Sequence, residues 1–396
     1  MTDSIQPQIL HICPLPLFSG LEQYALKLAL EESARGFQVG FAVLAGSELE
    51  TQCRREPSLR TFVVDFNWQS SLWGASTQYR DILLQEPGIE VVHLHSSQDI
   101  DRLGLALLRC RLAGSPRSPK IIQQNHLWIS HSKKDPAHWL THKILDEVWC
   151  SSTRAKQDLE RFLPVPHSKL YIIPYGRDLK IVENFATRAA ARKELNLPEK
   201  AVVLGAIARI DRGKGVWELL NASVELMQRG LDFYLVIIGG PTLSDPAAVT
   251  FADQVDEFVE GLEPEIKERV RLTGAIPNAG RLLRAFDLYA QVAYKETFSL
   301  ALLDAQLAEL PVIGTDSGGT PEVVRRNETG WLAAPESVSS LRDVIEQALS
   351  ERARWPEFGR AARGRVERDY DINVVIPTIL NRYGVTVKGQ VSDGLR

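Results

Sequence analysis

Three cations cluster where an apolar run gives way to an amphipathic one. In the segment "AIARIDRGKGVWELL" these are Arg209, Arg212 and Lys214. The amino end of a helix is a positive pole, so cations are disfavoured there unless an anion is bound. A diphosphate could be held by these side chains together with the free backbone amides. The alternative is that the three side chains face solvent or pair with acids, because surface charges are common.

Two carboxylates stand eight residues apart in "YKETFSLALLDAQLAELP". Glu296 follows a predicted strand, and Asp304 lies inside the next predicted helix. Helical side chains tilt toward the amino end, so Asp304 could lean back toward the loop and leave two hydrogen-bond acceptors for sugar hydroxyls. The alternative is that Glu296 favours the helix dipole while Asp304 faces solvent.

The first half of the chain offers weaker signals. In "CPLPLFSGLEQYALKLAL", Ser19 and Glu22 have the spacing of a capping box, which is enough to explain Glu22. Gly20 could let a phosphate or sugar approach the start of that helix, or it could serve a tight turn. His126 follows the predicted strand "KIIQQ" and could hydrogen-bond a ligand at its carboxyl end, with a structural role equally open.

His93 and His95 alternate along a predicted strand, so both point to one face and could share a metal. No third ligand is evident nearby in the sequence, so packing is favoured and no metal site is predicted.

A basic stretch, "DRLGLALLRCRLAGSPRSPK", carries cations that could touch an anionic lipid surface. A solvated helix face is the favoured alternative. The cations are Arg102, Arg109, Arg111, Arg117 and Lys120.

Short apolar runs alternate with amphipathic segments along the whole chain, which predicts an α/β protein with parallel sheets. The expected strands are 8–13, 38–44, 61–66, 90–95, 120–124, 147–150 and 170–174, then 201–208, 233–239, 270–274, 288–293 and 311–315. The pattern restarts after residue 200, so we expect two Rossmann-like domains, 1–180 and 181–370, with a C-terminal helix and tail at 371–396. The carboxyl ends of both sheets should meet at a cleft.

Length, charge and composition exclude several classes. The 396 residues are 44% hydrophobic and 24% charged, which is the globular average. The net charge of -4 disfavours a nucleic-acid partner. Four isolated cysteines, and a start without a basic and then apolar leader, predict a cytoplasmic protein. The absence of G-x-G-x-x-G, P-loop and G-x-S-x-G patterns weighs against a dehydrogenase, NTPase or hydrolase.

Joined in order, these segments resemble the retaining glycosyltransferases of the GT-B fold, family 4 (glycosyl transferases group 1). The resemblance covers nearly the whole chain. The segment "ARIDRGKG" is similar to the family's Arg-x4-Lys-Gly loop, and "ETFSLALLDA" is similar to its Glu-x7-Glu motif. "VVHLHS", "EVWCSSTRAKQDL" and "LYIIPYGRD" look like its first-domain landmarks. The resemblance implies two Rossmann-like domains facing across a cleft, with C-terminal helices crossing back.

The resemblance also implies roles. Arg209 and Lys214 would neutralise the diphosphate of a nucleotide sugar, and Glu296 would hold hydroxyls of the transferred sugar. The amides of Thr297, Phe298 and Ser299 would approach the phosphates or the sugar. Asp304 would hold the ribose diol, directly or through water, since the family usually has the longer Glu there. Gly20 and His126 would close the site from the acceptor domain, with His126 counted among the catalytic residues.

The prediction is therefore a metal-independent retaining glycosyltransferase without a cofactor. It would use a UDP- or GDP-sugar as donor and a lipid, saccharide or small-molecule acceptor, with peripheral contact to the inner face of a membrane as an added hypothesis. The alternatives are a sugar-nucleotide epimerase of the same fold and a non-catalytic nucleotide-sugar-binding or scaffold protein.

Overall fold

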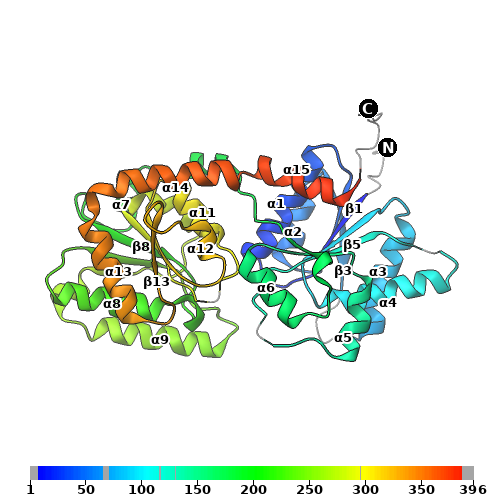
Figure 1. Ribbon diagram of the computed structural model, residues 1–396, viewed down its shortest axis with the longest axis horizontal. Coiled ribbons are helices and arrows are strands. Elements are labelled where there is room, and N and C mark those ends of the chain that lie inside the picture. The colour runs from blue at the N-terminus through cyan, green and yellow to red at the C-terminus, as the bar shows by residue number, and fades with distance from the viewer. Residues whose placement is uncertain (1–7, 66–70, 116, 130, 295, 386–396) are drawn as a thin grey trace. The chain divides into compact units, whose positions relative to one another are not determined.

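A computed structural model describes residues 8–65, 71–115, 117–129, 131–294 and 296–385 (Figure 1). The chain divides into two compact units. Unit 1 comprises Met1–Tyr175 and the chain from Asn373 onward, and unit 2 comprises Gly176–Ile372. The chain therefore passes from one unit to the other twice, once after Tyr175 and once after Ile372.

Unit 1 is built on a parallel seven-stranded sheet with the order β3-β2-β1-β4-β5-β6-β7. The order reverses at β1 and β4, and the carboxyl ends at such a switch point are where open α/β sheets bind ligands. The strands are β1 (Ile9–Cys13), β2 (Val39–Leu44), β3 (Leu59–Val64), β4 (Val91–Leu94), β5 (Lys120–Gln124), β6 (Glu147–Cys150) and β7 (Leu170–Ile172).

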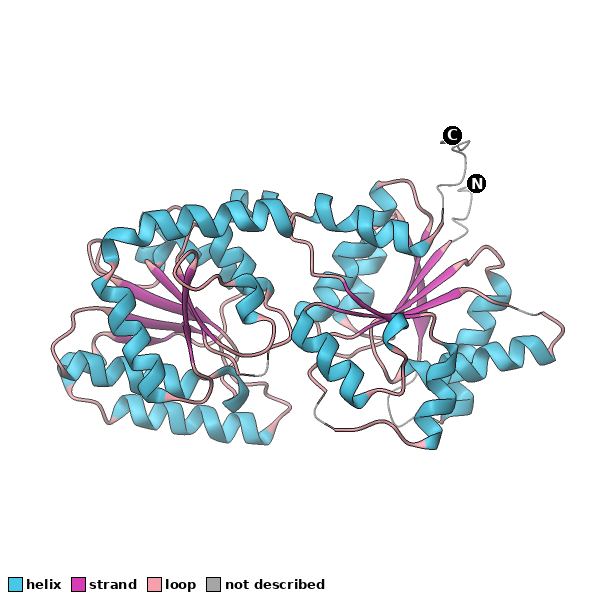
Figure 2. Cartoon of the chain, viewed as in Figure 1, coloured by secondary structure: helices cyan, strands magenta, loops and turns pink. Residues whose placement is uncertain are grey.

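The helices of unit 1 cover this sheet, and the last helix of the chain joins them (Figures 1 and 2). They are α1 (Gly20–Ala34), α2 (Glu48–Arg55), α3 (Leu72–Gln85), α4 (Asp99–Leu112), α5 (Pro136–Thr141), α6 (Thr153–Phe162) and α15 (Ile372–Tyr383). The Tyr383 hydroxyl is hydrogen-bonded to both Glu32 and His93, which fastens α15 to α1 and to the sheet.

Unit 2 repeats the plan with six parallel strands in the order β10-β9-β8-β11-β12-β13. Here the order reverses at β8 and β11. The strands are β8 (Val203–Ile207), β9 (Tyr234–Ile238), β10 (Val270–Leu272), β11 (Leu288–Gln291), β12 (Val312–Thr315) and β13 (Gly330–Ala333).

The helices of unit 2 lie on both faces of its sheet (Figure 1). They are α7 (Arg188–Glu194), α8 (Val216–Gln228), α9 (Pro246–Glu260), α10 (Pro264–Lys267), α11 (Leu300–Leu307), α12 (Thr320–Val323), α13 (Val338–Ser350) and α14 (Trp355–Asp369). Apolar side chains of α8, α9 and α13 pack with β8 and β9 into one core.

The predicted α/β class with two Rossmann-like parallel sheets is confirmed, and each predicted strand is present with small shifts at its ends. One strand, β13, was not predicted. It is the short run "GWLA" between polar residues, and it pairs with β12 only because Gly330 has no side chain: a Cβ there would lie 2.0 Å from the Val312 carbonyl oxygen.

The two faces of the unit 1 sheet differ in polarity. On one face, Leu10 and Ile12 of β1 enter an apolar core with α3 and α4. On the other, His11 of β1 lies beside His93 of β4 in register. All four cysteines are buried, and none of them forms a disulfide. Within the described residues, no helix combines the length and apolar character that crossing a bilayer requires.

Candidate active site

The loops after β8, β9, β11 and β12 meet at the carboxyl edge of the unit 2 sheet. Backbone hydrogen bonds join them into one surface: Ala208 N to Ile238 O (3.0 Å), Ile210 N to Gly240 O (3.0 Å), Tyr294 N to Gly213 O (3.2 Å) and Gly319 N to Glu296 O (3.0 Å). Because β8 and β11 are the strands where the order reverses, the loops with the predicted cations and the predicted carboxylate lie at the switch point of this sheet, where α/β sheets bind ligands.

Lys214 and Glu296 form an ion pair at this edge, with Nζ and Oε2 2.7 Å apart and both side chains mostly buried. Gly215, which follows Lys214, has a φ of +69°, and a Cβ there would lie 2.2 Å from the Val292 carbonyl oxygen. Only glycine fits that backbone, so Gly215 brings the Lys214 loop against the end of β11. The structure therefore brings together one predicted cation and the first predicted carboxylate.

The other two cations of the loop diverge. Arg209 is 59% exposed, donates to Thr242 Oγ1 (2.9 Å) and lies 3.2 Å from Asp211. Arg212 turns to α9, where its guanidinium lies 4.8 Å above the Phe251 ring. Arg209 is therefore the accessible guanidinium at the edge, whereas Arg212 is held by α9.

The segment after Glu296 is nearly closed to solvent. Thr297, Phe298 and Ser299 are 6 to 8% exposed, and Ser299 caps α11 by accepting from Leu302 N (3.2 Å). Gly318 packs against this segment with a φ of +58°, since a Cβ there would lie 1.9 Å from the Glu296 carbonyl oxygen. Gly318 therefore allows the backbone of the loop after β12 to pack directly against the backbone at Glu296.

Asp304 does not face solvent. It is buried, and Arg177 donates to both of its oxygens, from Nε to Oδ1 (2.5 Å) and from Nη2 to Oδ2 (2.8 Å). Burial raises the pKa of Asp304, and Arg177 opposes that rise. Arg177 lies in the landmark segment "LYIIPYGRD", but sequence reasoning gave it no role, because its partner Asp304 is 127 residues away.

In unit 1, Gly20 is exposed at the start of α1 with open space around it. Glu22 accepts from the backbone amide (2.8 Å) and hydroxyl (2.7 Å) of Ser19, as the predicted capping box requires. His126 is 8% exposed, and both of its ring nitrogens are engaged: Nε2 with His95 (3.1 Å) and Nδ1 with the Tyr175 hydroxyl (2.5 Å). Burial lowers the pKa of His126 to about 3, so the ring is neutral.

A third histidine, His11, joins His93 and His95, and one ring nitrogen from each lies within 4.8 Å of the others. The sequence alone did not reveal this neighbour, which comes from β1. The rings of His93 and His95 stack with their planes only 19° apart. A metal must lie in the plane of each ring that binds it, so stacked rings do not converge on one ion. The arrangement favours hydrogen bonding.

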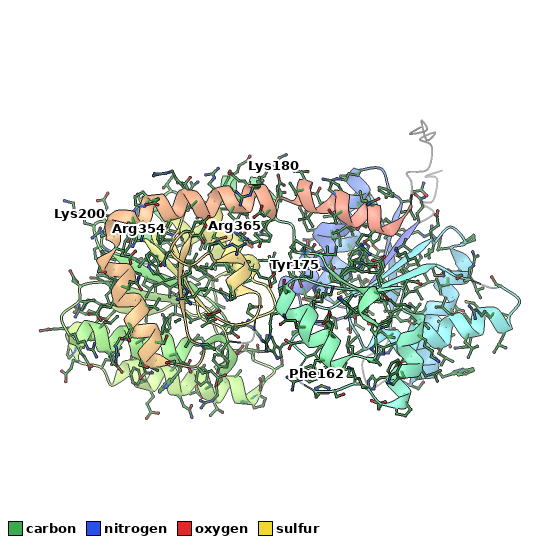
Figure 3. The ribbon with its side chains drawn as sticks, in the orientation of Figure 1. Phe162, Tyr175, Lys180, Lys200, Arg354 and Arg365 are labelled. Carbon is green, nitrogen blue, oxygen red and sulfur yellow. The ribbon has the colours of Figure 1, made fainter. Side chains whose placement is uncertain are left out.

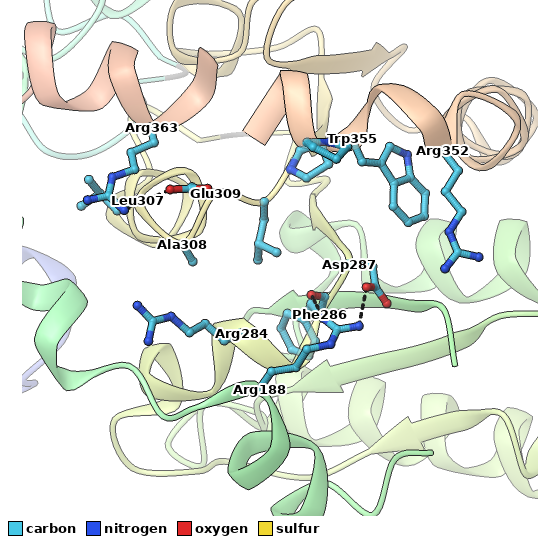
Figure 4. Close-up of a pocket in the computed structure, with 13 residues that line it drawn as sticks. Arg188, Arg284, Phe286, Asp287, Leu307, Ala308, Glu309, Arg352, Trp355 and Arg363 are labelled. Carbon is cyan, nitrogen blue, oxygen red and sulfur yellow. Dashed lines mark hydrogen bonds and ion pairs between the residues drawn. The ribbon is translucent and has the colours of Figure 1, made fainter. Parts of the chain in front are cut away.

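A separate pocket of about 570 Å³ lies at the opposite edge of the unit 2 sheet, where β11 and β12 begin (Figure 4). Arg188, Arg284, Arg352 and Arg363 line it, and Arg188 and Arg363 pair with Asp287 and Glu309. None of the predicted site residues lines this pocket.

Comparisons with known proteins agree with this architecture. Residues 187–365 match the family model described as glycosyl transferases group 1, and residues 18–181 match the model Glycosyltransferase Family 4. A D-inositol 3-phosphate glycosyltransferase from Nocardia farcinica is 28% identical over 225 residues, 55% of this chain and 48% of that protein. The chain thus spans about half the length of this relative.

Two solved structures share the fold. A glycosyltransferase from Rickettsia africae ESF-5 has a TM-score of 0.83 and 18% identity, covering 97% of this chain and 100% of that one. Anabaena Alr3699/HepE, solved in complex with UDP, has a TM-score of 0.78 and 15% identity, covering 95% and 99%. The fold is therefore that of the GT-B glycosyltransferases. Since the two family models together match most of the chain, the protein belongs to the group 1 glycosyltransferases of family 4.

Proposed function

We propose that this protein transfers a hexose from a UDP- or GDP-sugar to an acceptor hydroxyl with retention of anomeric configuration. The observation that carries the proposal is the Lys214–Glu296 pair at the carboxyl edge of the unit 2 sheet, with the accessible guanidinium of Arg209 on the same edge. A cation for the phosphates beside a carboxylate for sugar hydroxyls is what a nucleotide sugar requires. That Alr3699/HepE was solved with UDP supports UDP as the first donor base to test.

In this mechanism the bond between the sugar and the diphosphate breaks, and the acceptor oxygen bonds to the anomeric carbon from the face that the diphosphate leaves. A phosphate oxygen takes the acceptor proton, so no protein nucleophile forms a covalent intermediate. Arg209 and Lys214 stabilise the charge that develops on the leaving group. Glu296 holds sugar hydroxyls, and the amides of Thr297 to Ser299 approach the phosphates or the sugar. The two cations supply the charge stabilisation, so the proposal includes no metal.

Asp304 keeps its proposed role at the ribose diol. A carboxylate offers about four lone-pair positions, and Arg177 uses two of them. The remaining lone pairs can accept ribose hydroxyls, directly or through water. In unit 1, we propose that Gly20 and His126 contact the substrates and that this unit binds the acceptor.

We also propose peripheral contact with an anionic membrane through α3 and α4. The exposed side chains Trp73, Leu108 and Leu112 lie on these two packed helices at 61%, 52% and 79% exposure. The Arg109 guanidinium lies 4.1 Å above the Trp73 ring, which joins the apolar and basic groups into one patch. Aromatic, leucine and arginine side chains together are typical of membrane-surface helices.

The test is product analysis with one labelled nucleotide sugar and a panel of acceptors. Transfer with the anomeric configuration of the donor is the expected result, and Glu296→Ala should abolish transfer while the protein stays folded. An epimerised nucleotide sugar without transfer would favour the epimerase alternative. No reaction with any donor would favour a binding or scaffold protein, and unchanged transfer in Glu296→Ala would contradict the site.

A further inference from the structure

Five side chains form a continuous hydrogen-bonded chain through the polar face of the unit 1 sheet. Each of them is at most 8% exposed. The contacts are Glu32 Oε2 to His11 Nε2 (2.7 Å), His11 Nδ1 to His95 Nε2 (2.9 Å), His95 Nδ1 to His126 Nε2 (3.1 Å) and His126 Nδ1 to the Tyr175 hydroxyl (2.5 Å).

The fold places these side chains in sequence from helix to sheet edge. Glu32 comes from α1, His11 from the middle of β1, and His95 and His126 from the carboxyl ends of β4 and β5. Tyr175, labelled in Figure 3, follows β7 and stacks on Tyr24 of α1. The chain therefore starts under α1 and ends at the carboxyl edge, where α/β sheets bind ligands.

The hydrogen-bond directions follow from elementary chemistry. The Glu32 carboxyl oxygens act as acceptors in this network, so His11 Nε2 donates to Glu32. A neutral imidazole has one donor and one acceptor, so His11 Nδ1 accepts from His95 Nε2, His95 Nδ1 accepts from His126 Nε2, and His126 Nδ1 accepts from Tyr175. Burial holds the pKa of His95 and His126 far below the ordinary range, which keeps both rings neutral.

A side branch fixes the start of the chain. The Tyr383 hydroxyl of α15 donates to Glu32 Oε1 (2.8 Å), so its oxygen must accept from His93 Nδ1 (2.7 Å). Glu32 thus receives two donors and has no exposed surface. With Glu32 as the acceptor of both contacts, the direction of every bond that follows is determined.

We propose that Glu32 is a positioning residue that, through His11 and His95, holds His126 as its Nε2–H tautomer and so leaves His126 Nδ1 as a hydrogen-bond acceptor at the carboxyl edge. In the structure this nitrogen lies 2.5 Å from the Tyr175 hydroxyl, which is the donor in this tautomer. A hydroxyl of a bound substrate is recognised there in the same sense, as a donor. This last step rests on the proposed function, whereas the tautomer pattern does not.

The test is nitrogen NMR of the protein labelled with ¹⁵N in its histidine rings, without any substrate. The expected wild-type pattern is Nε2–H for His11, His95 and His126 and Nδ1–H for His93. Glu32→Gln can donate toward His11, so it should abolish this single pattern at His126. The matched control is Glu31→Gln, the neighbouring residue, which pairs with Lys27 and Arg35 instead and should leave the pattern intact.

A second variant keeps the test decisive if Glu32→Gln does not fold. His95→Phe keeps an aromatic ring and breaks the hydrogen-bonded chain between His11 and His126, so His126 should lose its fixed tautomer while His11 keeps its own. An Nδ1–H form of His126 in the wild type, or an unchanged His126 in the folded variants, would overturn the proposal.

Measurements of kcat and KM then distinguish a positioning role of Glu32 from a purely structural one. Glu32→Gln should lower kcat about tenfold, the effect of one misoriented hydrogen bond, with little change in KM for the donor. An unchanged kcat in a variant with a scrambled tautomer would overturn the role at the site. If the wild type transfers no sugar but shows the predicted tautomers, the proposed function fails and the positioning network stands.

Discussion

At the scale of residues, the charge on buried Asp304 depends on Arg177. Removing Arg177 leaves a carboxylate that is 10% exposed without its two donors. Breaking a buried ion pair from one side typically costs about 3 to 5 kcal/mol. Arg177→Ala should therefore lower the free energy of unfolding by about 3 kcal/mol, measured by urea unfolding. Arg281→Ala, which breaks an exposed pair with Glu194, is the matched control and should leave the free energy of unfolding nearly unchanged.

The loss of unfolding free energy in Arg177→Ala should be smaller at low pH than at high pH. Burial already raises the pKa of Asp304 above its value in the unfolded chain, and removing Arg177 raises it further. A carboxyl with a raised pKa binds its proton more readily in the folded state, so its destabilising effect disappears as pH falls through the folded pKa. The variant should be closer to wild type at pH 5 than at pH 8, and a loss that grows on acidification would contradict this account.

Some site residues could be predicted from the sequence and others could not. Arg209, Lys214 and Glu296 stand in short segments beside strand ends, so parallel-sheet topology alone places them at one edge. The Arg177–Asp304 pair and the Glu32–His11–His95–His126 chain join residues from distant elements. Their contacts depend on which strands are neighbours and how helices cross them, and no local spacing encodes that.

At the scale of elements, the loop after β12 should not tolerate a side chain at Gly318. Alanine there would have to adopt a φ of +58°, at a cost of roughly 1 to 2 kcal/mol, and would also collide with the Glu296 carbonyl. Gly318→Ala should lower Tm by several degrees and weaken UDP binding, because the Glu296 loop must move. Thermal unfolding with and without UDP measures both effects.

Gly240→Ala in the neighbouring loop is the control for this prediction. A Cβ at Gly240 would find its nearest neighbour at 3.6 Å, an ordinary contact. The control should unfold near the wild-type temperature and keep its UDP affinity. Equal behaviour of the two variants would show that the close approach at Gly318 is unimportant.

The patch on α3 and α4 makes a second prediction at this scale. Trp73→Ala with Leu112→Ala should reduce binding to vesicles containing anionic lipid at least threefold, since both side chains would insert at the interface. Leu243→Ala, an 86% exposed leucine in unit 2, should leave binding unchanged. Vesicle co-sedimentation measures both. Equal wild-type binding to anionic and zwitterionic vesicles, or none, would remove the membrane proposal.

Element prediction succeeded where apolar runs are long and failed where tertiary contact decides. β8 and β9 are five-residue strands within longer apolar runs, and both were predicted. β13 has four residues next to polar sequence, and its pairing depends on the missing side chain of Gly330 against Val312. Hydrophobic periodicity in the sequence cannot predict a strand that is stabilised mainly by its neighbouring strand.

At the scale of the whole molecule, the two parallel sheets carry different groups of candidate functional residues. Unit 2 carries the cations and the carboxylate of the proposed donor site on its carboxyl edge, and an arginine-lined pocket lies at the other edge (Figure 4). Unit 1 carries the histidine chain and receives α15 through Tyr383. If the donor site is built as proposed, nucleotide binding must stabilise the fold and must depend on the cations of the carboxyl edge alone.

Thermal unfolding with UDP, GDP, ADP and CMP tests this central claim most directly. A nucleotide at 100 times its Kd stabilises the folded state by about 2.7 kcal/mol. We predict a shift of several degrees that is selective for one base, is lost in Arg209→Ala and is retained in Arg284→Ala, which alters the opposite pocket. The absence of a shift with every nucleotide, or an equal shift in Arg209→Ala, would contradict the account.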